Sequence, residues 1–199
     1  DEERERSVSL APGSFTRLAF RFRLTNAPHG NWHTKFNGDE RCVKFQVHVA
    51  LEHGQRVAPL SLGLRCRADK QSFIFTFSDH DGSVVHAGAI RPRKSHCKPL
   101  ASGKCPVIVS LAGVGVNAAN QADAYKHANK KGTMVFGHDL AWVLAPARDG
   151  AHNWEGTGFL TAQAAVRALA QLAAGSRHEV DVTALIVAGH SRGGHGAMH

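Results

Sequence analysis

Apolar and polar positions alternate along the first ninety residues. Leu18, Phe20, Phe22 and Leu24 alternate with polar or small residues, and the odd positions from Val43 to Leu51 repeat the pattern. Such period-two alternation is typical of strands with one face in water. Clusters of turn-forming residues separate these stretches. This pattern therefore predicts that residues 15–90 form several short strands, which pack as an antiparallel, sandwich-like unit.

The pattern changes after a polar stretch that contains Pro92 and Pro99. The apolar segments that follow, at 107–111, 141–145 and 184–188, are continuous rather than alternating. Continuous apolar runs of this length predict strands that are buried on both faces.

Helical patterns separate these apolar strands. Asn117 is expected to cap a helix over residues 118–131 that ends at Gly132. A stripe of apolar residues with helical spacing over 162–173 predicts a second helix, with Gly175 just beyond its end. Strands that alternate with helices predict a parallel sheet covered by helices, that is, an α/β fold. We expect a β-rich N-terminal domain over residues 1–95, a linker over 96–105 and the α/β part over 106–199.

The segment Gly189-His190-Ser191-Arg192-Gly193 directly follows the last apolar strand. A serine between glycines at positions −2 and +2 fits a very sharp strand-to-helix turn, because larger side chains there would collide with neighbouring backbone. Such a turn exposes the serine hydroxyl and makes Ser191 the candidate nucleophile. The backbone N–H of Arg192 would be one donor to a developing oxyanion.

A second oxyanion donor is expected from the loop after the first apolar strand. Leu111-Ala112-Gly113-Val114-Gly115 occupies that place, and the backbone N–H of Val114 is the candidate donor. The alternative, a glycine turn that packing alone requires, stays open.

With these motifs, residues 105–199 resemble the α/β-hydrolase superfamily, particularly prolyl oligopeptidase-like serine peptidases and related esterases. Gly194 extends the match to their nucleophile elbow, and the segment through Ala197 also resembles S-formylglutathione hydrolase-type esterases. The chain departs from these families in two places. Ala112-Gly113 stands where His-Gly is common, and Arg192 stands where an aromatic residue or Asn is frequent.

The resemblance implies a triad in the order Ser, then Asp or Glu, then His. Only eight residues follow Ser191, so we expect an N-terminal piece of the hydrolase domain that is inactive alone. His195 and His199, one helical turn apart, are expected to point away from the nucleophile. Their spacing could suit a metal ion, but residues 196–198 supply no acidic partner. We therefore expect neither a metal nor a cofactor.

The expected function is that of a serine hydrolase, in the first place a prolyl oligopeptidase-like peptidase, acting on a small ester or peptide substrate. The alternatives are a carboxylesterase or S-formylglutathione hydrolase-like esterase, and a non-catalytic binding protein with a degenerate hydrolase domain. The polar loop after the strand at 141–145 is expected to line the substrate pocket or simply to cap a long loop. Its candidate residues are Arg148, His152, Trp154 and Glu155.

Composition narrows the choice of partners and compartment. The formal net charge is +8, but the basic residues are scattered, so we expect no specific nucleic-acid partner. No apolar run is long enough to span a membrane. Cys97 with Cys105, and Cys42 with Cys66, could form disulfides. If both pairs form, the protein is expected to be secreted or lumenal; if not, it is expected to be cytoplasmic.

Overall fold

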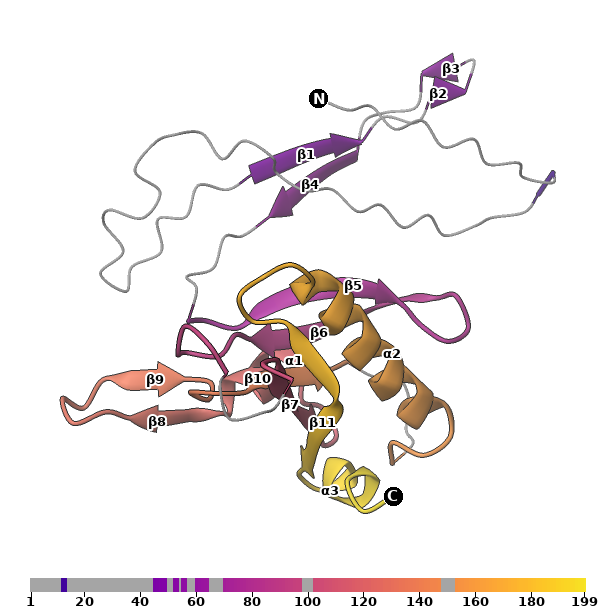
Figure 1. Cartoon of the computed structure of the whole chain (residues 1–199). Helices are drawn as coiled ribbons and strands as arrows, with labels where there is room; N and C mark the ends of the chain where they lie inside the picture. Colours follow the sequence, from indigo (N-terminus) through magenta and orange to yellow (C-terminus); the bar gives the residue numbers. More distant parts are fainter. Residues whose placement is uncertain are drawn as a thin grey trace.

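The computed structural model describes residues 12–13, 70–97, 102–147 and 153–199, together with the backbone of four short strands between residues 45 and 64 (Figure 1). These strands form two antiparallel pairs. They are β1 (Phe45–Val49) with β4 (Leu60–Leu64), and β2 (Glu52–His53) with β3 (Gln55–Arg56). The strand predicted around residues 18–24 lies outside the described residues.

A five-stranded mixed sheet forms the centre of the described part, in the order β11-β7-β10-β6-β5. β7 runs parallel to β10 and β11, whereas β6 runs antiparallel to β5 and β10. The parallel strands are those that the continuous apolar segments predicted, so the α/β class is confirmed. The bounds are β5 (Phe73–Ser78), β6 (Val84–Ile90), β7 (Cys105–Leu111), β10 (Trp142–Pro146) and β11 (Val180–Gly189).

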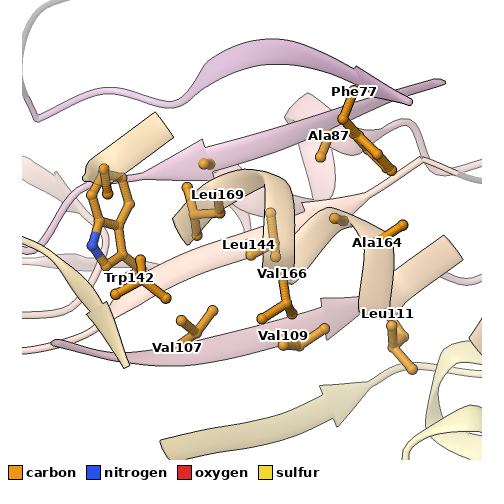
Figure 2. Close-up of a cluster of buried hydrophobic side chains, with 14 of the residues drawn as sticks. Phe77, Ala87, Val107, Val109, Leu111, Trp142, Leu144, Ala164, Val166 and Leu169 are labelled. Atoms are coloured by element: carbon orange, nitrogen blue, oxygen red, sulfur yellow. The ribbon is translucent and has the colours of Figure 1, made fainter. Parts of the chain in front are cut away.

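Helices cover both faces of this sheet. Alternate residues of β10 separate the two sides, because successive side chains of a strand point to opposite faces. Leu144 packs in the larger core together with Leu169 of α2 (Thr157–Ala173), as Figure 2 shows. Val143 packs on the other face together with Ala122 of α1 (Ala118–Asp123).

The predicted boundary at residues 96–105 does not divide the sheet from a separate β domain. β6, which precedes that boundary, pairs with β10, which follows it. The expectation that residues 15–90 form a unit apart from the later sheet is therefore wrong for β5 and β6. The alternation at Phe73, Phe75 and Phe77 reflects an edge strand that packs one face on the core, and such a strand has the same period as a sandwich strand.

The predicted helix over 118–131 is shorter than expected. Asn117 does cap α1, since its side chain accepts the Asn120 N–H, but the helix ends at Asp123. A hairpin of β8 (Lys126–Ala128) and β9 (Met134–Phe136) replaces the rest. The Asn129 side chain accepts the N–H groups of the hairpin turn, and Gly132 has a φ of 74° there. Turn chemistry thus overrides the helical propensity of this Ala- and Lys-rich stretch.

The second predicted helix is confirmed as α2. Its buried residues lie on one face and include Ala165, Val166 and Leu169. Gly175 follows the helix with a φ of 71°, which is the left-handed conformation expected just beyond a helix end.

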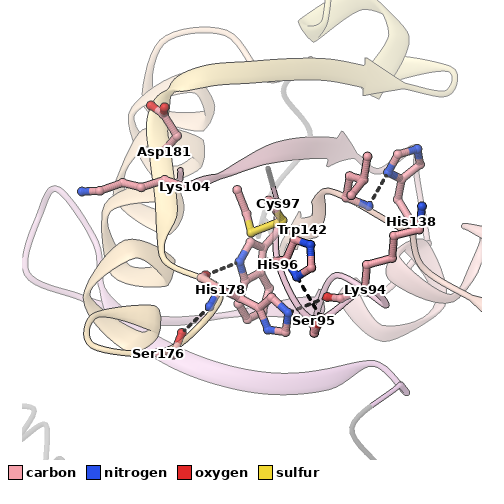
Figure 3. Close-up of a disulfide and its surroundings, with 12 residues drawn as sticks. Lys94, Ser95, His96, Cys97, Lys104, His138, Trp142, Ser176, His178 and Asp181 are labelled. Atoms are coloured by element: carbon pink, nitrogen blue, oxygen red, sulfur yellow. Dashed lines mark hydrogen bonds between the residues drawn. A yellow bond between two sulfur atoms is a disulfide. The ribbon is translucent and has the colours of Figure 1, made fainter. Parts of the chain in front are cut away.

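A disulfide closes the segment that the sequence suggested as a linker. Cys97 and Cys105 are bonded and fully buried (Figure 3). Close by, the Trp142 indole donates to the His178 carbonyl oxygen at 2.8 Å, and the His178 ring lies 2.7 Å from the Lys94 carbonyl oxygen. One of the two suggested cysteine pairs is therefore formed, and Cys42 and Cys66 lie outside the described residues.

β11 forms one edge of the sheet and is far more exposed than β7 or β10. Leu185, Ile186 and Val187 are each about half exposed, so the expectation of burial on both faces is wrong for this strand. The register with β7 shifts between Val180 and Leu185. At this irregularity Asp181 accepts hydrogen bonds from the hydroxyls of Thr183 and Ser102. These hydrogen bonds lower the pKa of Asp181 to about 2.

Candidate active site at the carboxyl end of the sheet

Ser191 lies in the sharp turn between β11 and α3 (Arg192–Gly196), at the end of the sheet where the chain finishes in Figure 1. Its φ of 56° and ψ of −121° are values that residues with a side chain rarely adopt. Holding a residue in such a region costs about 1–3 kcal/mol, and strain of this kind clusters at functional sites. The serine is therefore presented by a backbone that the surrounding structure forces into place.

The two flanking glycines are required by close approaches of backbone to backbone. A Cβ atom on Gly189 would lie 2.0 Å from the Gly193 carbonyl oxygen, and one on Gly193 would lie 1.8 Å from the Leu111 carbonyl oxygen. Real Cβ atoms essentially never approach within 3.0 Å. Gly194 has no such neighbour, because its nearest contact would be 3.5 Å away. The spacing of Gly189 and Gly193 around Ser191 thus has the steric cause that the sequence suggested.

The loop after β7 packs directly against this turn. A Cβ on Gly113 would lie 3.3 Å from the Ser191 Cβ and 3.2 Å from the His190 carbonyl oxygen. The His190 N–H also donates to the Leu111 carbonyl oxygen at 3.4 Å. The Val114 side chain is exposed. The two segments expected to supply oxyanion donors, at Arg192 and Val114, therefore adjoin Ser191 from two sides.

Trp154 joins the loop before α2 to both of these segments. Its indole N–H donates to the Ala112 carbonyl oxygen at 2.9 Å, and a Cβ on Gly196 would lie 2.3 Å from the Trp154 Cβ. Trp154 is buried, so it supports the loop after β7 rather than lining an open pocket. Its own φ of 65° shows that this loop is also held in an unusual conformation.

The other loop residues expected at the pocket divide into two groups. Glu155 is exposed, and its carboxylate lies 2.5 Å from the His195 Nε2. Arg148 and His152 lie outside the described residues.

His195 and His199 do not approach the nucleophile through any hydrogen bond. His195 Nε2 faces Glu155, and His199 Nε2 lies 3.2 Å from His195 Nε2. Within the described ranges, no hydrogen bond joins the Ser191 hydroxyl to a histidine. A proton acceptor for this serine is therefore not among the contacts of residues 70–97, 102–147 and 153–199.

A hollow beside the elbow was not expected from the sequence. It has a volume of about 280 Å³, and His190 is one of the residues that line it. Ser110 of β7 is buried in its wall and accepts a hydrogen bond from the Gln121 side chain at 2.7 Å. The sequence feature that could have indicated this hollow is Ser110, a polar residue near the end of an otherwise apolar strand. The remaining lining residues are Ala124, Tyr125, Ala188 and Gly189.

No protein-family model matches the chain, and no curated protein matches it at a significant level. Among the described residues, no helix combines the length and apolar character that crossing a membrane requires. The site must therefore be interpreted from its own geometry.

Proposed function

We propose that the protein is a serine hydrolase of the α/β-hydrolase type, with Ser191 as the nucleophile. The observation that carries the proposal is the strained conformation of Ser191 between two glycines that tolerate no Cβ. A serine presented on a sharp strand-to-helix turn above a parallel sheet is the arrangement from which these enzymes attack carbonyl groups. A glycine-rich turn that served packing alone would not require positive φ at a serine.

In the proposed reaction the Ser191 Oγ attacks the carbonyl carbon of an ester or peptide, and its proton passes to a base. The carbonyl oxygen becomes an oxyanion that accepts hydrogen bonds from the N–H groups of Arg192 and Val114. Collapse of this intermediate expels the alcohol or amine, which takes up a proton, and leaves an acyl group on Ser191. Water then releases the acid in a second, equivalent step.

The base and its acidic partner follow the nucleophile along the chain in this superfamily. His195 and His199 follow Ser191 but are engaged with Glu155 and with each other. We therefore assign neither histidine as the base.

We place a peptidase before an esterase, because a β-rich unit often precedes the catalytic part of such peptidases, which is an analogy at the level of the fold. β5 and β6 do not belong to such a unit, since they lie in the central sheet. β1 to β4 remain as paired strands outside it. A non-catalytic binding protein is the third candidate function.

The test is labelling with a fluorophosphonate probe and turnover of p-nitrophenyl esters and a peptide amide by the whole protein that contains this sequence. Ser191→Ala should abolish labelling and turnover. Ser95→Ala, which removes an exposed hydroxyl away from the elbow, should leave both unchanged. Amide turnover would favour the peptidase and ester turnover alone the esterase. An intact, folded protein without labelling or turnover would favour the binding protein.

The oxyanion role of Val114 can be tested by removing its N–H. Val114→Pro should lower kcat by about 10²–10³-fold, the usual cost of one oxyanion donor. Val114→Ala keeps the N–H and, because this side chain is exposed, should leave kcat almost unchanged. Equal activity in all three proteins would remove Val114 from the oxyanion hole.

A further inference from the structure

Three metal-binding side chains from two separate segments converge beside α3. Glu155 precedes α2, whereas His195 lies in α3 and His199 follows it. His195 Nε2 is 2.5 Å and His199 Nε2 is 3.9 Å from the same oxygen of Glu155, and the two Nε2 atoms are 3.2 Å apart. One ligand atom of each residue therefore lies within 4.8 Å of those of the other two.

A hydrogen bond between His195 Nε2 and the Glu155 carboxyl group accounts for one of the close contacts. Each of the three atoms offers a lone pair when it carries no proton. A cation placed among the three atoms accepts all three lone pairs at once.

The spacing of the three atoms suits a tetrahedral metal ion. Zinc binds histidine nitrogen at about 2.0–2.1 Å and carboxylate oxygen at about 2.0–2.2 Å, so neighbouring ligands in a tetrahedron lie roughly 3.3–3.4 Å apart. The observed separations of 2.5, 3.2 and 3.9 Å bracket this value. All three side chains are exposed, so they can adjust by small rotations, and water can complete the coordination.

The chemistry of the ligands selects the class of metal. Two imidazoles and one carboxylate suit zinc and neighbouring divalent transition metals, whereas calcium and magnesium prefer oxygen ligands only. The local sequence offered no acid near His195 and His199, and folding supplies one from forty residues away. We infer that Glu155, His195 and His199 form a binding site for a divalent transition-metal ion of the zinc class.

Such an ion would tie the loop before α2 to the helix that follows Ser191. Glu155 adjoins Trp154, whose indole N–H bonds to the Ala112 carbonyl oxygen. The metal would therefore hold α3 and the loop after β7 in a fixed relation from outside the nucleophile turn. This role does not depend on Ser191 acting as a nucleophile.

The experiment is calorimetric titration of the tag-free chain with ZnCl₂, together with the visible spectrum of the Co²⁺-loaded protein. The wild type should bind one zinc ion at this site and show the strong absorption of tetrahedral cobalt. His199→Ala should weaken zinc binding by more than about 100-fold, because even outer-shell partners are worth about 10–100-fold. At 100 times the Kd, zinc should raise the Tm by roughly 5–10 °C, and chelation should reverse the shift.

Two controls separate this site from other histidines. His86→Ala removes an exposed histidine in β6 and should leave zinc binding unchanged. His80→Ala disrupts a second group of possible ligands, Asp79, His80 and Asp81, and should also leave it unchanged. Glu155→Gln should weaken binding in the same direction as His199→Ala. Zinc binding that survives His199→Ala with a normal circular dichroism spectrum, or that is lost with His80→Ala, would overturn the proposal.

Discussion

β10 and β11 are both continuous apolar strands that run parallel to β7, yet they have opposite environments. β10 lies in the middle of the sheet with every residue buried, whereas β11 lies at the edge with its large apolar side chains about half exposed. The carboxyl end of β11 nevertheless carries the strained turn with Ser191. In this molecule the fully buried strand is therefore not the strand that presents the candidate chemistry.

The largest expected difference between the two strands concerns matched leucines. Leu144→Ala in β10 should lower the free energy of unfolding by about 2–5 kcal/mol, because it leaves a cavity in a fully buried core. Leu185→Ala in β11 should cost about half as much or less, since part of its surface already contacts water. Urea denaturation of the two variants measures the difference. Equal losses would mean that β11 is buried in solution and would break the comparison.

The next effect concerns the turn after β11. Gly193→Ala should destabilise the protein by about 1–3 kcal/mol or more, because its Cβ would overlap the Leu111 carbonyl group. Gly194→Ala, one residue later, would place its Cβ 3.5 Å from its nearest neighbour, and should be neutral or slightly stabilising, since alanine favours helix over glycine. Thermal unfolding of the pair checks this. A harmless Gly193→Ala would mean that α3 does not pack on β7 as described.

A smaller effect should come from the strain at Ser191. Ser191→Gly should stabilise the protein by about 1 kcal/mol, because glycine accepts this backbone conformation without steric cost. Ser191→Ala keeps the Cβ and should not gain stability, although both variants should lose fluorophosphonate labelling. A Ser191→Gly protein no more stable than Ser191→Ala would show that the turn is not strained.

The smallest effect should appear at the other end of β11, where Asp181 should make the stability of the protein depend on pH. Hydrogen bonds from Thr183 and Ser102 lower the pKa of Asp181 from 3.8 to about 2 in the folded chain. A lowered folded-state pKa stabilises the protein above the unfolded value, and this contribution is lost as pH falls from about 4 to about 2. The stability difference between wild type and Asp181→Asn should therefore shrink over that interval. Thr183→Ala should move the pKa of Asp181 back toward 3.8 in an NMR titration.

The local sequence pattern was sufficient to predict those elements whose form is set by residues close together in the sequence. The apolar runs that became β7, β10 and β11, the stripe of α2 and the Gly189–Gly193 spacing could each be predicted, because burial and backbone sterics act within a few residues. Period two could not distinguish β5 from a sandwich strand, since both pack one face and expose the other. The edge position of β11 depends on which strands pair beside it, and no local pattern encodes that.

The contacts around the elbow were harder to predict for the same reason. Trp154 was expected to line a pocket or to cap a long loop, and its hydrogen bond to Ala112 spans 42 positions of the sequence. The partner of His195 is 40 positions away. Only the folded sheet brings these segments together, so the sequence did not indicate these contacts.

The Trp154 hydrogen bond has a spectroscopic consequence. An indole that is buried and donates to a carbonyl group emits at shorter wavelength than one that donates to water. Any movement of the loop after β7 that breaks the bond to Ala112 should therefore shift the fluorescence of Trp154 to the red. Trp142, bonded to His178 in the sheet core, should stay constant and act as an internal reference. Trp154 fluorescence can therefore report on movement of the loop proposed to bind the oxyanion, without any added label.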